Sequence, residues 1–231
     1  TLRQTPISTV WEDDEQFNRF RRSYEKCPPH YMKKRDDIRT LGQRGERLTV
    51  TSHDGLTLCG RLVLPESEPK CTVIMFHGFR SEPTHDFGPF AYDLINMGVA
   101  VLMVDQRAHG GSEGRHISFG INERRDALLW SRLISEKFPE QKILLYGLSM
   151  GATTVLAASE LPLPSSVVGI VADCGFTTPD DICKKVMVKD MKLPGFPLFI
   201  ISRLLVRKLA GFDFCDISAV TAVQNTTLPC L

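Results

Sequence analysis

The chain has 231 residues, of which 28 are Lys or Arg and 27 are Asp or Glu, so its formal net charge is +1. This balance excludes a polybasic nucleic-acid binder and a protein with a long acidic tail. Hydrophobic residues make up 42% of the chain and charged residues 24%, which excludes a disordered or fibrous chain and is typical of one globular domain.

The first part of the chain predicts a helical extension over residues 1–44. Its clearest helix spans Trp11–Tyr24, where aromatic residues recur mostly at steps of three and four among charged residues. We expect this helix to pack on the outside of the main domain, and a partner-binding surface is the less favoured alternative. The polar stretch Thr1–Val10 indicates no signal peptide.

An α/β core is predicted over residues 45–175. Asp54 and Gly55 form a hairpin turn pair between the strand segments Leu48–Thr51 and Leu56–Leu64, so the sheet starts antiparallel. Short apolar runs then alternate with helix-length segments, and runs that are apolar on both faces are typical of buried parallel strands. The predicted parallel strands are Cys71–Phe76, Val99–Val104, Lys142–Tyr146 and Val167–Ala172. The predicted helices between them are Phe87–Met97, Asn122–Phe138 and Met150–Glu160.

This order predicts an α/β fold with a doubly wound, mostly parallel sheet, helices on both faces and sites at the carboxyl ends of the strands. Residues 176–226, rich in Pro, Lys and aromatic side chains, interrupt the alternation and predict a short helical lid insertion. Within it, Leu198–Leu209 is expected to form a helix that faces a pocket, with an ordinary packing helix as an equally good interpretation. Residues 227–231 then resemble the start of the next core strand.

The most specific motif is Gly147-Leu148-Ser149-Met150-Gly151, between a predicted strand and a predicted helix. This is the nucleophile elbow pattern in its required strand-turn-helix context. The turn is so tight that side chains at Gly147 and Gly151 would collide, and it leaves the Ser149 hydroxyl exposed above the sheet. The pattern therefore predicts Ser149 as a catalytic nucleophile.

A second motif, His77-Gly78-Phe79-Arg80, ends the strand Cys71–Phe76. An acyl-transfer enzyme of this layout needs two backbone amides there to stabilise the tetrahedral oxyanion. The candidate donors are the amides of Phe79 and Met150. We expect His77 to be a structural hydrogen-bonding residue rather than the catalytic base.

A third motif, residues 105–112, follows the strand Val99–Val104 and contains Asp105, Arg107 and His109. A catalytic Asp/His pair would lie in the wrong place relative to the serine strand. We therefore interpret this segment as a polar loop in which Asp105 and Arg107 fix turns.

Taken together, the hairpin and the motifs HGF, DQRAHGGS, GLSMGA and ADCGF resemble the α/β-hydrolase fold, in particular its bacterial serine-aminopeptidase-like and lysophospholipase-like branch. The resemblance covers roughly residues 45–231. It implies that Ser149 attacks an acyl carbonyl, that Phe79 and Met150 supply the oxyanion hole, and that the lid shapes an acyl or aromatic pocket.

The resemblance also implies a catalytic acid and a histidine that follow the serine, and the chain contains neither at the matching positions. All six histidines precede Ser149: His30, His53, His77, His85, His109 and His116. Asp173 is a less favoured candidate for the acid. If the chain ended at Leu231, the strand Val167–Ala172 would be an exposed edge. We therefore expect a fragment that lacks the final strands and continues for about 70 or more residues.

The leading hypothesis is a serine hydrolase that cleaves acyl esters, or alternatively thioesters or amides, through an acyl-enzyme on Ser149, with no metal and no cofactor. One alternative is a non-catalytic or truncated binding protein of the same fold. Another is an acyltransferase or peptidase, because specificity depends on the pocket. No phosphate-binding glycine motif follows any strand, which disfavours a nucleotide-binding domain.

The expected partner is a small-molecule acyl substrate and not nucleic acid; the acyl group, the leaving group and the oligomeric state stay open. The apolar stretch Phe196–Val206 is too short for a membrane span. Seven cysteines without paired spacing favour a reducing compartment, so we expect a cytoplasmic location. A membrane anchor upstream of Thr1, which is not a start Met, is the alternative.

Overall fold

The computed structural model describes residues 28–30, 33–34, 37, 40, 42 and 45–231. The predicted helix Trp11–Tyr24 lies outside the described residues, as does most of the predicted extension over residues 1–44.

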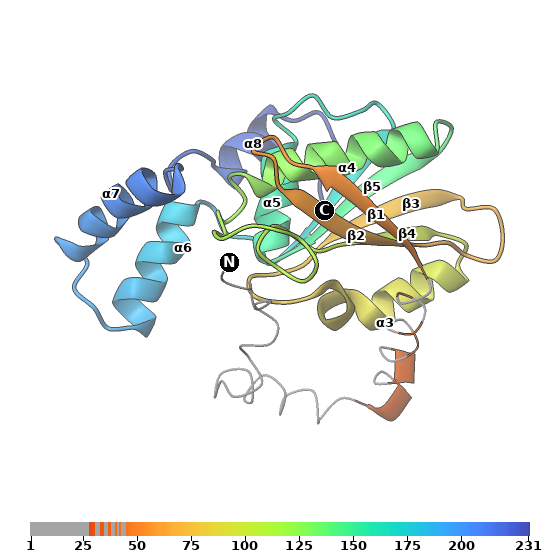
Figure 1. Ribbon diagram of the computed structural model, residues 1–231, viewed down its shortest axis with the longest axis horizontal. Coiled ribbons are helices and arrows are strands. Elements are labelled where there is room, and N and C mark those ends of the chain that lie inside the picture. The colour runs from red at the N-terminus through yellow and green to blue at the C-terminus, as the bar shows by residue number, and fades with distance from the viewer. Residues whose placement is uncertain (1–27, 31–32, 35–36, 38–39, 41, 43–44) are drawn as a thin grey trace.

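A six-stranded mixed sheet forms the centre of the molecule, in the order β1-β2-β4-β3-β5-β6 (Figure 1). The pairs β1–β2 and β2–β4 are antiparallel, and the pairs β4–β3, β3–β5 and β5–β6 are parallel. The predicted mostly parallel α/β sheet with an antiparallel hairpin at its start is therefore confirmed. The strands are β1 (Glu46–Thr51), β2 (Thr57–Val63), β3 (Cys71–Phe76), β4 (Ala100–Val104), β5 (Lys142–Leu148) and β6 (Val167–Asp173).

Helices cover both faces of this sheet (Figure 1). Alternate residues of β3 point to opposite faces, so Ile74 and Phe76 belong to one apolar cluster and Val73 and Met75 to another. The first cluster packs against α4 (Glu123–Lys137) and α5 (Met150–Ala158), and the second against α3 (Pro83–Asn96). Burial on both faces explains why the inner parallel strands β3, β4 and β5 are solid apolar runs in the sequence.

Helix α3 begins at Pro83 rather than at the predicted Phe87. Pro83 stands in the first turn, where its fixed φ suits a helix and its missing amide hydrogen leaves no intrahelical bond unmade. A second proline, Pro89, lies inside the helix and is buried. These prolines hide the start of the helix from a reading of apolar periodicity.

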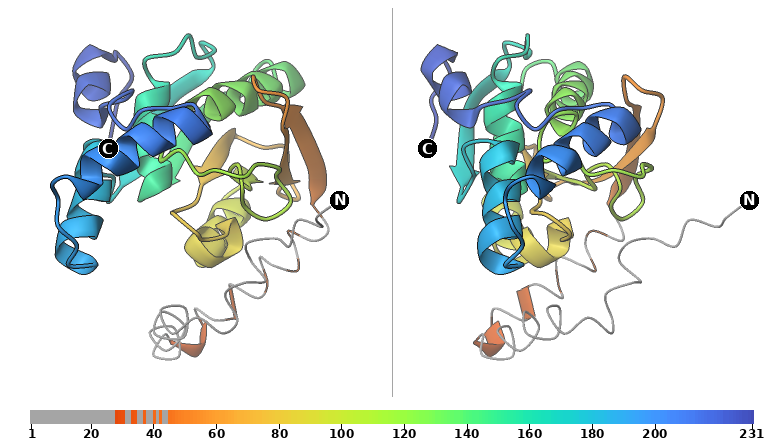
Figure 2. Two further views of the ribbon diagram at one scale, coloured as in Figure 1. Left: turned by 60° about the vertical axis from the view of Figure 1, so that its left-hand side comes forward. Right: turned by 90° about the vertical axis from the view of Figure 1, so that its left-hand side faces the viewer.

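Residues 176–226 contain three helical elements beyond the predicted helix: α6 (Pro179–Lys185), η2 (Val186–Asp190) and α8 (Ala219–Asn225). The predicted helix is α7 (Leu198–Ala210), which lies beside α6 at one side of the core (Figures 1 and 2). Its residue Phe199 is buried in an aromatic cluster with Phe212 and Phe214 that reaches α5 through Ala157. Along α7, five apolar side chains are about half exposed or more: Ile200, Ile201, Leu204, Leu205 and Leu209.

The segment after α8 runs parallel to the outer edge of β6. The Ile170 and Ala172 amides donate to the carbonyl oxygens of Pro229 and Leu231 at 2.9 and 2.8 Å, and the Leu231 amide donates to the Ile170 carbonyl oxygen at 3.0 Å. Backbone groups of β6 that face away from β5 are therefore paired along this stretch.

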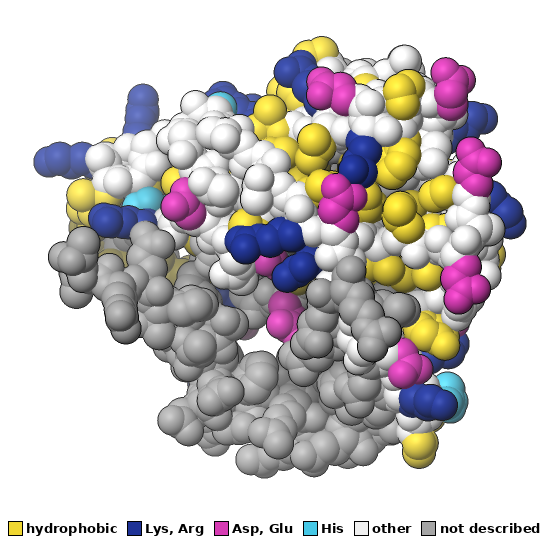
Figure 3. Space-filling view, turned by 45° about the vertical axis from the view of Figure 1, so that its right-hand side comes forward, with side chains coloured by type: hydrophobic (Ala, Val, Ile, Leu, Met, Phe, Trp, Pro, Cys, Tyr) yellow, Lys and Arg dark blue, Asp and Glu magenta, His cyan; other side chains and the backbone are white. Residues whose placement is uncertain are grey.

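Acidic and basic side chains are interspersed with hydrophobic ones over the part of the surface drawn in colour in Figure 3. Of the helices that the structure describes, none combines the length and the apolar composition that crossing a membrane requires.

Trp130 of α4 is the largest fully buried side chain among the described residues, and none of them forms a hydrogen bond with its Nε1 atom. We predict that Trp130→Ala lowers the free energy of unfolding by about 3–5 kcal/mol because it opens a cavity. Trp130→Phe is expected to cost less, since no hydrogen bond is lost. Urea denaturation measures both values, with Met97→Ala at a 63% exposed position as the control. Equal losses for the Ala variants at positions 130 and 97 would contradict this account.

Candidate active site

Ser149 lies at the sharp turn between β5 and α5 with φ 52° and ψ −109°. Its amide donates to the Asp173 carbonyl oxygen of the neighbouring strand at 2.8 Å, and its carbonyl oxygen accepts from the Thr153 amide at 3.2 Å. A positive φ is strained for a residue with a Cβ, so the surrounding packing must hold it. The strain is found at the residue that the sequence predicts as the nucleophile.

The two elbow glycines make this turn sterically feasible. A Cβ on Gly147 would collide with the backbone of Gly151, and a Cβ on Gly151 would collide with the Phe76 carbonyl group at the end of β3. Only a hydrogen atom fits at either position. The G-x-S-x-G spacing in the sequence therefore has the steric origin that we expected.

The turn after β3 packs directly against Ser149. A Cβ placed on Gly78 would lie 3.6 Å from the Ser149 Cβ atom and 3.7 Å from the Leu148 carbonyl oxygen. Phe79 follows Gly78 and is 43% exposed, and its ring stacks on Phe119 with 5.4 Å between ring centroids. The structure thus brings the HGF turn and the elbow together.

Two backbone amides of this region are unpaired. Within the part of the chain that the structure describes, neither the Phe79 amide nor the Met150 amide donates a hydrogen bond to a protein acceptor. Met150 is the first residue of α5, where amides point out of the helix and carry its partial positive charge. These are the two groups that the sequence predicts as the oxyanion hole.

His77 lies beneath this turn and is completely buried. Its Nε2 atom accepts the Gln106 amide hydrogen at 3.1 Å, so its proton is on Nδ1, which donates to the Gly78 carbonyl oxygen at 2.8 Å. Burial, and secondarily the nearby His109, lower the pKa of His77 to about 3. Both ring nitrogens are occupied by backbone groups, which agrees with a structural role and not with that of a base.

Both ring nitrogens of His109 are likewise bonded to backbone groups. Its ring lies 4.7 Å from that of His77, its Nε2 accepts from the Arg80 amide at 3.1 Å, and its Nδ1 donates to the Arg107 carbonyl oxygen at 2.9 Å. Burial lowers the pKa of His109, so this imidazole is also neutral. The two histidines together tie the HGF turn to the loop after β4.

That loop is held by the residues predicted to fix its turns. The Asp105 carboxylate accepts the Gly111 amide at 2.9 Å, and burial raises the pKa of Asp105. Arg107 is 3% exposed and donates to both Asp126 oxygens at 2.7 and 2.8 Å and to Asp54 at 3.0 Å. The loop therefore has a packing role, as expected, and it contains no Asp/His pair facing Ser149.

The Ser149 hydroxyl forms no hydrogen bond with any described residue. Asp173 is exposed at the end of β6, and no hydrogen bond joins its carboxylate to Ser149 among the described residues. The histidine that would accept the serine proton is thus not among the residues that surround Ser149 in the described structure. No group of three or more His, Cys, Asp or Glu side chains in that same part of the chain is arranged to bind a metal.

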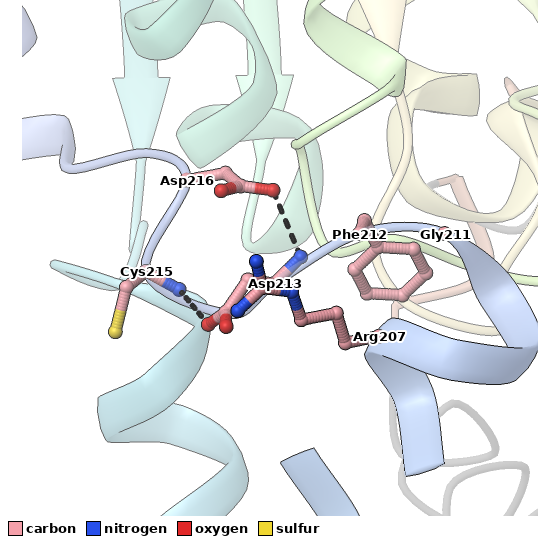
Figure 4. A pocket seen from close by; sticks show the side chains of 6 residues that line it. All are labelled: Arg207, Gly211, Phe212, Asp213, Cys215 and Asp216. Carbon is pink, nitrogen blue, oxygen red and sulfur yellow. Dashed lines mark hydrogen bonds between the residues drawn. The ribbon is translucent and has the colours of Figure 1, made fainter. Parts of the chain in front are cut away.

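A pocket of about 410 Å³ lies at the end of α7 (Figure 4). The Asp213 amide donates to Asp216 at 2.8 Å, and the Cys215 amide donates to Asp213 at 3.1 Å (Figure 4). Neither Ser149 nor either candidate oxyanion donor lines it, so we do not assign it to the active site. Its lining residues are Arg207, Gly211, Phe212, Asp213, Cys215 and Asp216.

The sequence interpretation missed three residues of this region. Gln106 donates from its side chain to the His77 carbonyl oxygen, Phe119 stacks on Phe79, and Asp86 accepts the Gly78 amide at 2.7 Å. Gln106 lies inside the motif DQRAHGGS, which offered a signal. Phe119 and Asp86 have no sequence signal that links them to the turn.

Comparison with known proteins agrees with this geometry. Residues 67–201, more than half of the chain, match the family described as "Serine aminopeptidase, S33". The chain belongs to this family of α/β hydrolases. The match includes the HGF turn, the loop after β4 and the elbow.

Two relatives of this serine aminopeptidase family member extend the comparison. The uncharacterized protein YqkD of Bacillus subtilis is 25% identical over 183 residues, which is 79% of this chain and 59% of YqkD. The monoglyceride lipase of Rattus norvegicus is 30% identical over 116 residues, which is 49% of this chain and 38% of the lipase. The chain therefore spans about three fifths of the length of YqkD and about two fifths of that of the lipase.

A solved esterase structure from Pyrococcus furiosus shares the fold of this family member. Its TM-score is 0.61 at 24% sequence identity, and the match covers 80% of this chain and 68% of the esterase. At this level of identity the likeness shows the α/β-hydrolase fold.

The buried neutral histidines predict a specific acid sensitivity. In the unfolded chain His77 binds a proton near pH 6.5, whereas in the folded protein it does so only near pH 3. Between these pH values the unfolded state binds more protons, so the free energy of unfolding falls as the pH decreases. We expect a contribution of up to about 1.4 kcal/mol per pH unit. Urea denaturation at pH 7, 6 and 5 should give a flatter dependence for His77→Gln than for the wild type. A His77→Gln slope equal to that of the wild type would refute the assignment.

Proposed function

We propose that Ser149 is the nucleophile of a serine hydrolase that cleaves acyl esters through an acyl-enzyme intermediate, with the amides of Phe79 and Met150 as the oxyanion hole. Thioesters and amides are the further substrates that the same chemistry permits. The membership in the serine aminopeptidase family supports a hydrolase.

One observation carries the proposal: a strained serine stands between two unpaired amides. Ser149 has φ 52°, the Met150 amide directly follows it, and the Phe79 amide belongs to the turn that packs against its Cβ atom. Unpaired amides cost free energy unless water or a ligand accepts from them. An oxyanion that forms on the carbon bonded to Ser149 Oγ would supply that acceptor.

The reaction then follows from the positions of these atoms. Ser149 Oγ forms a bond to the acyl carbon and loses its proton to a general base, and the carbonyl oxygen becomes an oxyanion held by the two amides. The C–O bond to the leaving group breaks, and the alcohol takes the proton. Water, activated by the same base, releases the carboxylic acid and restores Ser149.

The family resemblance implies that the general base is a histidine that follows the nucleophilic serine in sequence order. No histidine of this chain follows Ser149. Loss of a triad member leaves only the residual catalysis of the oxyanion hole, so the chain without such a base is expected to hydrolyse esters slowly.

The surroundings of the candidate oxyanion hole favour an apolar acyl group. The half-exposed Phe79 ring stacks on Phe119, which meets Phe214 edge-to-face at 6.2 Å between centroids. Such rings offer an apolar wall beside the reacting carbonyl. The similarity to monoglyceride lipase points the same way. We further propose a lid role for the helices of residues 176–226.

A non-catalytic binding protein is the second candidate, because no described residue accepts a hydrogen bond from the Ser149 hydroxyl.

For location, six described cysteines are free, which supports a reducing compartment such as the cytoplasm. A membrane anchor upstream of Thr1 is the alternative.

We predict that the natural full-length protein is labelled by a fluorophosphonate at Ser149, because the probe needs an activated serine and an oxyanion hole. Ser149→Ala should lose the label and lower ester hydrolysis by about 10³-fold or more. Peptide mapping by mass spectrometry locates the adduct.

Ser159→Ala is the matched control, since Ser159 follows α5 and its hydroxyl only donates to the Leu156 carbonyl oxygen. It should keep both labelling and hydrolysis. A wild-type protein that does not react at Ser149 would favour the binding protein instead.

A further inference from the structure

Asp86 of α3 takes no part in the chemistry above, yet its carboxylate lies directly behind the turn of residues 77–81. Its Oδ2 atom accepts the Gly78 amide at 2.7 Å. Its Oδ1 atom accepts the Ser81 hydroxyl at 2.5 Å and lies 3.0 Å from His85 Nδ1. The side chain is only 7% exposed, so these contacts are made away from solvent.

Three amides of this turn have acceptors, and the Phe79 amide between them has none among the described residues. The Gly78 amide donates to Asp86, the Arg80 amide to His109 Nε2 at 3.1 Å, and the Ser81 amide to the Gly78 carbonyl oxygen at 3.3 Å. The Phe79 amide has no acceptor among the described residues. The hydrogen bonds of these neighbouring amides fix the turn, and the Phe79 amide is left to donate to a ligand.

We infer that Asp86 is a positioning residue for the reaction: by holding the Gly78 peptide, it keeps the next amide, that of Phe79, beside Ser149 for the oxyanion. The inference rests on the proposed function. Gly78 is the residue that transmits this effect, because its amide is bonded to Asp86 and a Cβ placed on it would lie 3.6 Å from the Ser149 Cβ atom.

The negative charge of the Asp86 carboxylate must be stabilised by hydrogen-bond donors, because the side chain is buried. Burial alone would raise the pKa of Asp86, but the hydrogen bonds from His85, Gly78 and Ser81 hold it below its usual value, so the carboxylate is ionised. A carboxylate without such partners would repel a nearby oxyanion. The donors on the turn and on α3 account for this charge and at the same time orient the turn.

The positioning role differs from a purely structural one in its kinetic signature. An amide that acts only on the oxyanion stabilises the transition state, so its displacement lowers kcat and leaves KM nearly unchanged. A merely structural carboxylate would change the melting temperature without this split. Asp86→Asn keeps a side-chain oxygen that can accept from the Gly78 amide, whereas Asp86→Ala removes it.

The experiment uses the natural full-length protein and measures ester hydrolysis and the rate of fluorophosphonate labelling at Ser149. Asp86→Ala should lower kcat and the labelling rate by about 10²-fold, with KM changed by less than about threefold, as for loss of an oxyanion donor. Asp86→Asn should stay within about 10-fold of the wild type. Asp93→Ala is the control, because Asp93 lies on the same helix and pairs at the surface with Lys34.

Wild-type kcat and labelling in a folded Asp86→Ala variant would overturn the inference, and so would equal losses in the Ala and Asn variants. If Asp86→Ala does not fold, Asp86→Ser, whose shorter side chain cannot bridge Gly78 and Ser81, replaces it with the same expected loss. If the wild type is not labelled at Ser149, the proposed function fails and this inference fails with it. A labelled wild type with an equally labelled Ala variant overturns the inference alone.

Discussion

The close approach of the β5–α5 turn to the end of β3 is the constraint on which the site depends. The backbone at Gly151 lies against the Phe76 carbonyl group with no room for a Cβ atom. The turn cannot move away, because α3 fills one face of the sheet and α4 and α5 fill the other. Ser149 is therefore held at a positive φ, where its side chain stands at the carboxyl ends of the parallel strands.

A second layer of polar contacts makes the HGF turn as fixed as the elbow. Neutral imidazole is the one side chain that offers a donor and an acceptor at opposite sides of a rigid ring. His77 and His109 use both to join the turn to the loop after β4. Fixed donors need no reorganisation when charge develops, which is the basis of electrostatic stabilisation in acyl transfer.

Structural features that local sterics or burial determine can be predicted from the sequence. Strands β3, β4 and β5 could be located because apolar clusters cover both of their faces. The elbow could be located because Gly147 and Gly151 admit no side chain. Contacts between distant segments left no local pattern. Arg107 donates to Asp54, which lies 53 positions earlier in the chain. Asp86 on α3 accepts from the Gly78 amide only because the turn after β3 folds against this helix.

Helix α3 and the insertion show the same limit. Pro83 fits the first turn of α3 and Pro89 lies inside the helix, and together they conceal its apolar period. In the insertion, the short helices α6 and α8 have too few turns for a periodic pattern, and Thr178 and Ser218 cap them through side-chain hydrogen bonds. Their existence could be predicted only as a helical lid, without their boundaries.

The central claim is that the Phe79 and Met150 amides bind the oxyanion formed at Ser149. A crystal structure of the natural full-length protein with a phosphonate bonded to Ser149 Oγ tests it most directly. The account predicts a phosphoryl oxygen that accepts from both amides at about 2.7–3.1 Å. A phosphoryl oxygen that points to solvent or is bound by other donors would contradict it.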